Sequence, residues 1–190
     1  MLEVLEIPEV RKRVAAVTVE RYHRMIDLGF FAERPVELIN GVIVEKMSKS
    51  ALHLYLVALL LKSLQRHCAE AVFWVRKEDP ITIGNSEPEP DLSVVKGSLE
   101  DFRHVKPTTA QFVAEVAINS LALDRAKVRE YGKAEVPEVW IVQPEERLIE
   151  VYRNPVAGVY SEILEVPAET VLESIALPGF AFRLADALAE

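Results

Sequence analysis

The sequence has few of the features that mark disulfide-rich, zinc-binding or membrane proteins. Cys68 is its one cysteine, which excludes an internal disulfide framework and a zinc site built on cysteines. No glycine-rich phosphate loop is present, which argues against nucleoside-triphosphate hydrolysis. The most apolar run, residues 51–64, is interrupted by His53 and Lys62 and is too short to cross a bilayer. The N-terminal segment carries acids early and does not resemble a signal peptide, so we expect a soluble, cytoplasmic protein.

Positive charge is scarce in the last third of the chain. The net charge of −8 by itself argues against a nucleic-acid partner. However, the part from Glu135 onward contains 11 acids and 3 lysines or arginines, and residues 1–134 hold the remaining 19 acids and 19 lysines or arginines. The acidity therefore belongs to the C-terminal third, and the first two-thirds could still present a basic face.

What the sequence does contain is the pattern of one α/β domain. The length of 190 residues and a hydrophobic content of 50% suit a single domain with a sizeable core. The patterns predict a helix over 18–29, a hairpin around Asn40-Gly41, a helix over 51–70, a strand within 71–83, strands over 91–95 and 111–118, a helix over 123–135, a strand over 138–144, a meander over 147–166 and a short final helix. This order predicts a sheet sandwiched between helices.

Two acids interrupt apolar strands, and both need a physical explanation. Asp91 opens the strand of "DLSVV", and Glu115 lies inside "QFVAEVAI". Burying an unpaired carboxylate costs several kcal/mol, so such a group protonates, pairs or binds a metal. If the two strands are neighbours, the two carboxylates meet and need a cation between them. Hard oxygen ligands suit Mg²⁺ or Mn²⁺.

Two further charged residues are ambiguous on their pattern alone. Glu37 lies between Val36 and Leu38 in the first hairpin strand, and the alternation of side chains predicts a solvent-facing acid. Lys127 shares a helix face with Asp124 and Tyr131. It either folds back over the acid cluster or is a solvated lysine paired with Asp124. Metal-bound acids with a lysine would suit phosphodiester hydrolysis.

The order of these residues resembles a known nuclease family. Glu37, "EPDL", "AEVA" and Lys127 follow one another as in the PD-(D/E)XK nuclease superfamily, and the stretches "VELINGVIVEKMSKSALH", "SEPEPDLSVVKG", "AEVAINSLALDRAKVREYGKAEVPEVWIVQPEERLIEVYRNP" and "LPGF" resemble the Uma-type restriction endonucleases. The resemblance covers nearly all of the chain after the first helix. It implies a restriction-endonuclease-like core with a mixed central β-sheet flanked by helices, followed by a C-terminal β-meander. We therefore expect one domain over 1–190, with an N-terminal helix at 18–29, the core at 36–153 and an extension at 154–190.

The resemblance also implies roles for individual residues. Asp91 and Glu115 match the metal ligands, and the backbone carbonyl of Val116 completes the metal shell in such proteins. Glu37 matches an acidic site position, which favours a site role over a surface acid. The family motif has a lysine two residues after the second acid, and this chain has Ala117 there. In the Uma-type pattern, a lysine four residues before a helical tyrosine takes the place of the motif lysine. In this chain that residue is Lys127, before Tyr131.

Three more residues are candidates for substrate binding. His53 is either a pocket residue or a packed helix residue, and Ser120 is either a helix N-cap or part of the site. Arg125 either contacts phosphates or is a solvated helix charge. Glu87 and Glu89, in the stiff segment before Asp91, are expected to be solvated.

These observations support a hypothesis of function with two alternatives. The leading hypothesis is a Mg²⁺-dependent DNA endonuclease, with Mn²⁺ as a possible substitute, acting as a homodimer because cleavage of both strands often uses two sites. The first alternative is a nuclease-fold protein that binds nucleic acid without cutting it, which Ala117 favours. The second is an interaction protein that docks a basic partner through its acidic C-terminal third.

Overall fold

A six-stranded sheet forms the centre of the protein. The computed structural model describes residues 7–69 and 72–189. The strands of the sheet are β3 (Phe73–Lys77), β4 (Leu92–Lys96), β5 (Phe112–Val116), β6 (Glu138–Gln143), β7 (Leu148–Val156) and β8 (Val159–Pro167). They lie side by side in chain order; β5 and β6 are parallel, and the other neighbouring pairs are antiparallel. The predicted mixed sheet with a C-terminal meander is confirmed.

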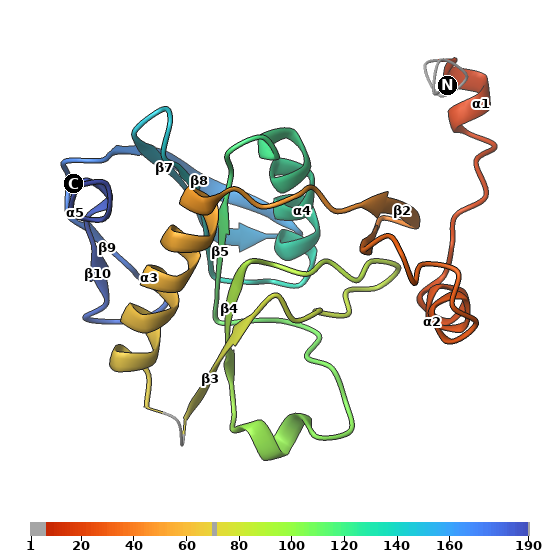
Figure 1. The fold of residues 1–190 in the computed structure, drawn as a ribbon, viewed down its shortest axis with the longest axis horizontal. Coiled ribbons are helices and arrows are strands. Elements are labelled where there is room, and N and C mark those ends of the chain that lie inside the picture. The colour runs from red at the N-terminus through yellow and green to blue at the C-terminus, as the bar shows by residue number, and fades with distance from the viewer. Residues whose placement is uncertain (1–6, 70–71, 190) are drawn as a thin grey trace.

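Two helices cover the opposite faces of this sheet (Figure 1). The long helix α3 (Ala51–His67) packs its leucines against alternate residues of β4 and β5. The helix α4 (Leu121–Lys133), which connects β5 to β6, packs against the other face, where Tyr131 is fully buried. Successive residues of a strand point to opposite faces. Val116 therefore belongs to the core under α3, whereas Glu115 faces α4.

The N-terminal part forms a smaller lobe to one side of the sheet (Figure 1). It contains α1 (Pro8–Arg11), α2 (Val19–Asp27) and the hairpin of β1 (Val36–Ile39) and β2 (Val42–Glu45). Tyr22 of α2 packs with β1 residues in a separate small core.

Two short-range signals in this lobe are confirmed. The side chain of Thr18 accepts a hydrogen bond from the backbone N–H of Arg21 at 3.2 Å, which is the expected N-cap. Asn40 and Gly41 form the hairpin turn with φ of 48° and 75°, the left-handed conformation that this dipeptide tolerates.

The alternation rule was wrong for Glu37. All four residues of β1 are buried, and Glu37 is only 2% exposed. The rule identifies which side chains share a face, but it does not show whether a face is open to solvent. Here one face of β1 packs on α2, and the other face is directed toward α4, where Glu37 contacts Lys127.

The ends of several elements also differ from the predictions. The helix α3 ends at His67, which is earlier than predicted. The predicted end was near residue 70, and residue 70 lies outside the described residues. The final helix α5 (Leu184–Ala187) is a single turn. It follows a small antiparallel pair, β9 (Leu172–Glu173) and β10 (Ala181–Phe182), which the sequence did not indicate. In the stretches 7–69 and 72–189, no helix has the length and hydropathy needed to span a membrane.

Candidate active site

Asp91 and Glu115 meet at one end of the sheet. Because β4 runs antiparallel to β5, the residue before β4 lies beside the end of β5. The backbone N–H of Asp91 donates to Oε2 of Glu115 at 3.1 Å, and the N–H of Val116 donates to Oδ2 of Asp91 at 2.9 Å. The two acids and the Val116 peptide are therefore held together by the backbone of two neighbouring strands.

Lys127 folds back over these acids from α4. Its Nζ lies 3.2 Å from Oε1 of Glu37, 3.5 Å from Oε1 of Glu115 and 3.5 Å from Oδ1 of Asp124. The residue is 6% exposed, so the solvated interpretation of Lys127 was wrong. One ammonium is thus shared by three carboxylates that come from β1, β5 and α4.

The segment before Asp91 connects the N-terminal lobe to this site. Glu37 accepts a hydrogen bond from the backbone N–H of Glu89 at 3.0 Å, and Glu89 pairs with Lys46. Glu87 is 2% exposed and accepts hydrogen bonds from His23 at 2.8 Å and 2.9 Å. The expectation of solvated side chains was wrong for Glu87, because the N-terminal lobe covers this segment.

Burial and crowding change the acid–base properties of the cluster. Burial raises the pKa of Glu115 to about 8; Lys127 and Tyr131 oppose the shift, and the nearby carboxylates of Asp124 and Asp91 reinforce it. Burial likewise raises the pKa of Asp124. For Lys127, burial lowers the pKa, but the surrounding carboxylates outweigh it and raise the pKa. The surrounding carboxylates therefore favour the charged form of Lys127, whereas burial favours the neutral form of Glu115.

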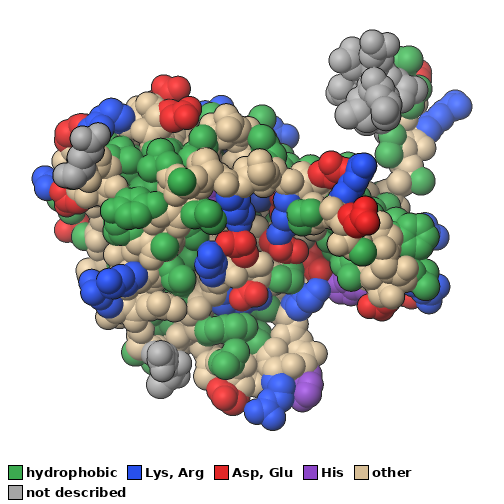
Figure 2. All heavy atoms as spheres, viewed as in Figure 1, with side chains coloured by type: hydrophobic (Ala, Val, Ile, Leu, Met, Phe, Trp, Pro, Cys, Tyr) green, Lys and Arg blue, Asp and Glu red, His purple; other side chains and the backbone are tan. Residues whose placement is uncertain are grey.

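A pocket opens over this cluster. Figure 2 shows acidic and basic side chains gathered in the hollow between the main body and the N-terminal lobe. The charged side chains that line the pocket are Glu37, Glu89, Asp91, Glu115, Asp124, Lys46, Lys49 and Lys127. Five carboxyl groups thus face three ammonium groups in the pocket.

The donor set of the pocket fits a divalent cation. Carboxylate and backbone carbonyl oxygens are the ligands that Mg²⁺ and Mn²⁺ prefer, and the carboxyl groups of the pocket outnumber its ammonium groups. In the described part of the chain, no three His, Cys, Asp or Glu side chains form a ready-made metal centre. A metal here would therefore depend on two carboxylates and on oxygens from the backbone, water or substrate.

The comparisons with known proteins bear on this geometry. A family model named Uma2, with the description "Putative restriction endonuclease", matches residues 19–185. The chain belongs to the Uma2 family. A comparison with curated proteins found no match.

A solved structure supports the same fold for this Uma2 protein. The crystal structure of "a putative nuclease belonging to DUF820" from Anabaena variabilis is similar to it with a TM-score of 0.76 and 15% sequence identity. The match covers 90% of this chain and 97% of the Anabaena chain. At this identity the similarity shows the fold, and it confirms the predicted nuclease-like architecture.

Of the three predicted substrate-binding residues of this Uma2 protein, two line the pocket and one does not. His53 lines the pocket, and its Nε2 lies 3.0 Å from Oδ1 of Asp91. Ser120 also lines the pocket, but its hydroxyl donates to Asp124 at 2.5 Å, and its side chain makes no N-cap hydrogen bond. Arg125 does not line the pocket, because it points to the neighbouring part of the sheet and pairs with Glu150.

Sequence reasoning missed the site roles of several residues in this Uma2 chain. Asp124 and Tyr131 had been identified only as neighbours of Lys127 on one helix face. Both contact the cluster: the Tyr131 hydroxyl donates to Oε1 of Glu115 at 2.6 Å. The spacing of three and four residues around Lys127 could have indicated them. Lys49 had no sequence signal, and only the fold brings it to the pocket.

Proposed function

We propose that this Uma2 protein is a Mg²⁺-dependent endonuclease that hydrolyses phosphodiester bonds in DNA. The observation that carries the proposal is the meeting of Glu37, Asp91, Glu115 and Lys127 in one pocket, although they are spread over ninety residues of sequence. Ordinary surface charges would not converge in a buried position, because desolvating them is unfavourable. A site that binds a divalent cation explains both the convergence and the surplus of carboxyl groups over ammonium groups.

The metal would be held by the carboxylates of Asp91 and Glu115 and by the carbonyl of Val116. Mg²⁺, or Mn²⁺ in its place, supplies a bound water of lowered pKa and neutralises charge on the phosphate. Asp91 is oriented for this role by the N–H of Val116 and by His53. Glu115 is oriented by Tyr131 and by the N–H of Asp91.

Lys127 would act as a fixed cation beside the attacking water. Because its surroundings raise its pKa, it stays charged and stabilises developing negative charge rather than transferring a proton. Glu37 and Asp124 both contact its ammonium group and position it, and Ser120 positions Asp124. We leave Arg125 out of this site, since its guanidinium pairs with Glu150.

A homodimer is part of the proposal, because cutting both strands of a duplex calls for two sites. Sedimentation analysis with and without DNA tests it directly. A monomer under both conditions would reduce the proposed activity to the nicking of single strands.

The test of the proposed function is cleavage of plasmid and genomic DNA with Mg²⁺ or Mn²⁺. We expect wild type to nick or cut DNA and EDTA to abolish the activity. Asp91→Asn should lose activity, and Glu145→Gln, which changes an exposed turn acid, should retain it. A double variant, Lys127→Ala with Ala117→Lys, moves the lysine to the motif position, which lies on the Glu115 face of the sheet. If the double variant cleaves DNA faster than Lys127→Ala alone, this would support the role of Lys127.

Ala117 also favours a second candidate function, binding of nucleic acid or a protein partner without catalysis. The family motif has its lysine at this position, and its replacement by alanine removes a cation from the strand. Binding of Mn²⁺ and DNA without any cleavage would support this candidate and contradict the first one.

A further inference from the structure

Lys49 lies at the mouth of the pocket and is not explained by the roles above. It belongs to residues 46–50, which connect β2 to α3 and line the pocket. Its Nζ lies 2.8 Å from Oε2 of Glu78 and 3.5 Å from Oδ1 of Asp91. The side chain is 27% exposed, so it faces both the acid cluster and the solvent. Lys49 thus places a positive charge beside an oxygen that the proposed metal would use.

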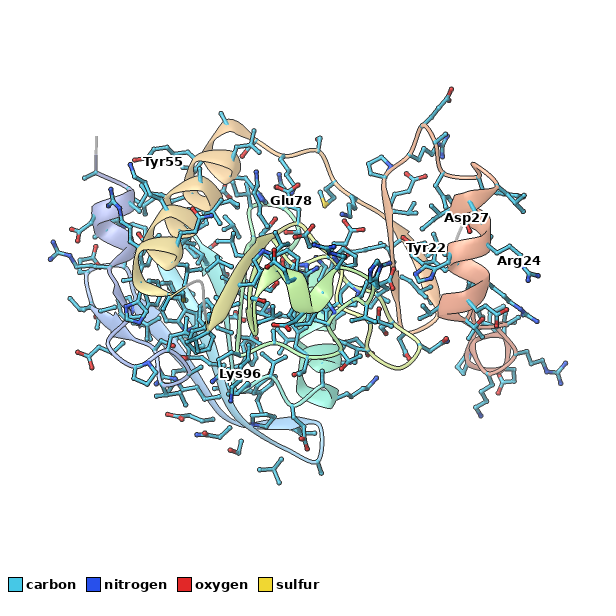
Figure 3. The ribbon with its side chains drawn as sticks, turned by 90° about the horizontal axis from the view of Figure 1, so that it is seen from below. Tyr22, Arg24, Asp27, Tyr55, Glu78 and Lys96 are labelled. Carbon is cyan, nitrogen blue, oxygen red and sulfur yellow. The ribbon has the colours of Figure 1, made fainter. Side chains whose placement is uncertain are left out.

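Glu78 holds Lys49 at this position through an ion pair. Glu78 follows β3 and has a φ of 55°, in the left-handed region that L-residues avoid. Its N–H donates to the carbonyl of Asp91 at 3.2 Å, and it lies between the end of β3 and the segment leading into α3 (Figure 3). The ion pair with Glu78 thus keeps Lys49 near Asp91.

We propose that Lys49 binds a phosphate group of the nucleic-acid substrate, and that a divalent metal frees it for this role by displacing it from Asp91. The inference rests on the proposed function. A metal ion bound to Asp91 and the ammonium of Lys49 are like charges a few ångströms apart, and they repel each other. Glu78 retains Lys49 at the pocket mouth, where the ammonium can meet a phosphate as a point charge. Metal binding and substrate binding are thereby coupled through one side chain.

The test uses Lys49→Met, because this change removes the charge and keeps most of the side-chain volume. Lys77→Met is the matched control: Lys77 lies 3.2 Å from the other oxygen of Glu78, but it does not line the pocket. Calorimetric titration with Mn²⁺ should show affinity for Lys49→Met increased on the order of tenfold over wild type, since a repelling charge is gone. Lys77→Met should bind Mn²⁺ like wild type.

Binding of DNA should change in the opposite direction. We expect Lys49→Met to bind a fluorescein-labelled DNA duplex of mixed sequence more weakly than wild type, in Ca²⁺, which takes the same oxygen ligands. The slope of log affinity against log salt concentration should fall by about one, the value for one lost phosphate contact. Lys49→Arg should keep the wild-type slope, and all variants should unfold at the wild-type temperature.

The outcomes separate this inference from the proposed function. If wild type binds no Mn²⁺ either alone or together with the DNA duplex, the proposed function is wrong, and the inference fails with it. If wild type binds Mn²⁺ and Lys49→Met binds it equally well, only the inference is wrong. Tighter Mn²⁺ binding with unchanged DNA affinity and salt slope would also overturn it, because Lys49 would then be a counter-ion alone.

Discussion

Glu87 and Glu115 are both buried carboxylates, and their surroundings differ in one decisive respect. Glu87 has its own cation and two further contacts: Lys106 lies 2.7 Å from one of its oxygens, His23 contacts both oxygens, and the Thr82 hydroxyl donates at 2.8 Å. Glu115 shares the single ammonium of Lys127 with two other carboxylates.

The pKa values of the two acids therefore shift in opposite directions. Burial opposes ionisation of Glu87, but Lys106, His23 and Thr82 outweigh it and lower its pKa. Burial dominates for Glu115 and raises its pKa to about 8. The comparison suggests that a structural acid is buried together with its counter-ion, whereas a functional acid is buried with a deficit of positive charge. The deficit around Glu115 is what a metal ion would fill.

Among variants of these two acids, the largest expected effect is the loss of DNA cleavage in Glu115→Gln. We expect DNA cleavage to fall by a hundredfold or more, on the order of the several kcal/mol that a metal contributes to such a reaction. The free energy of unfolding without metal should stay within about 1 kcal/mol of wild type. The amide oxygen still accepts from Tyr131, and removal of a crowded acid offsets the lost hydrogen bond from the Asp91 N–H. Plasmid nicking and urea unfolding measure the two effects.

Glu87→Gln should show the reverse pattern. The variant leaves Lys106 without its buried partner, and we expect the free energy of unfolding to fall by about 2 kcal/mol. Mn²⁺ binding by the folded protein should be unchanged. Urea unfolding and calorimetry test this, and a loss of Mn²⁺ binding as large as that in Glu115→Gln would remove the distinction between the two acids.

The pH dependence of stability should depend on Glu87. Its pKa is lowered in the folded state, whereas the unfolded chain has the ordinary value of about 4.3. The folded protein thus binds fewer protons, so this contribution is fully present above about pH 4.3 and is lost as the pH falls through the folded pKa. The stability difference between wild type and Glu87→Gln should shrink from neutral pH to about pH 3, as urea unfolding at several pH values would show.

His23→Ala should have the smallest effect. His23 contacts Glu87, but its side chain is 39% exposed, and Lys106 remains as a partner of the acid. We expect a loss of about 0.5–1 kcal/mol in the free energy of unfolding. His104→Ala changes an exposed histidine and should be neutral. A loss above that of Glu87→Gln would show that His23, and not Lys106, is the main partner of Glu87.

Much of the fold was predictable because it depends on local rules. The Thr18 cap, the Asn40-Gly41 turn and the apolar strands each follow from a few adjacent residues. The site was predictable in part for a different reason. Asp91 and Glu115 stand out because carboxylates are costly inside apolar strands, and the family resemblance added Glu37 and Lys127 to them.

What the sequence by itself determined is which residues are apolar, where the turns lie, and which acids interrupt strands. The tertiary structure alone decided that Glu37 and Glu87 are buried, that Asp124 joins the cluster and that Lys49 faces Asp91. The physical reason is that periodicity assigns a side chain to a face of its own element, whereas the charge, exposure and partners of that face depend on the elements packed against it. Lys49 and Asp91 are 42 residues apart, and no local rule relates residues at that separation.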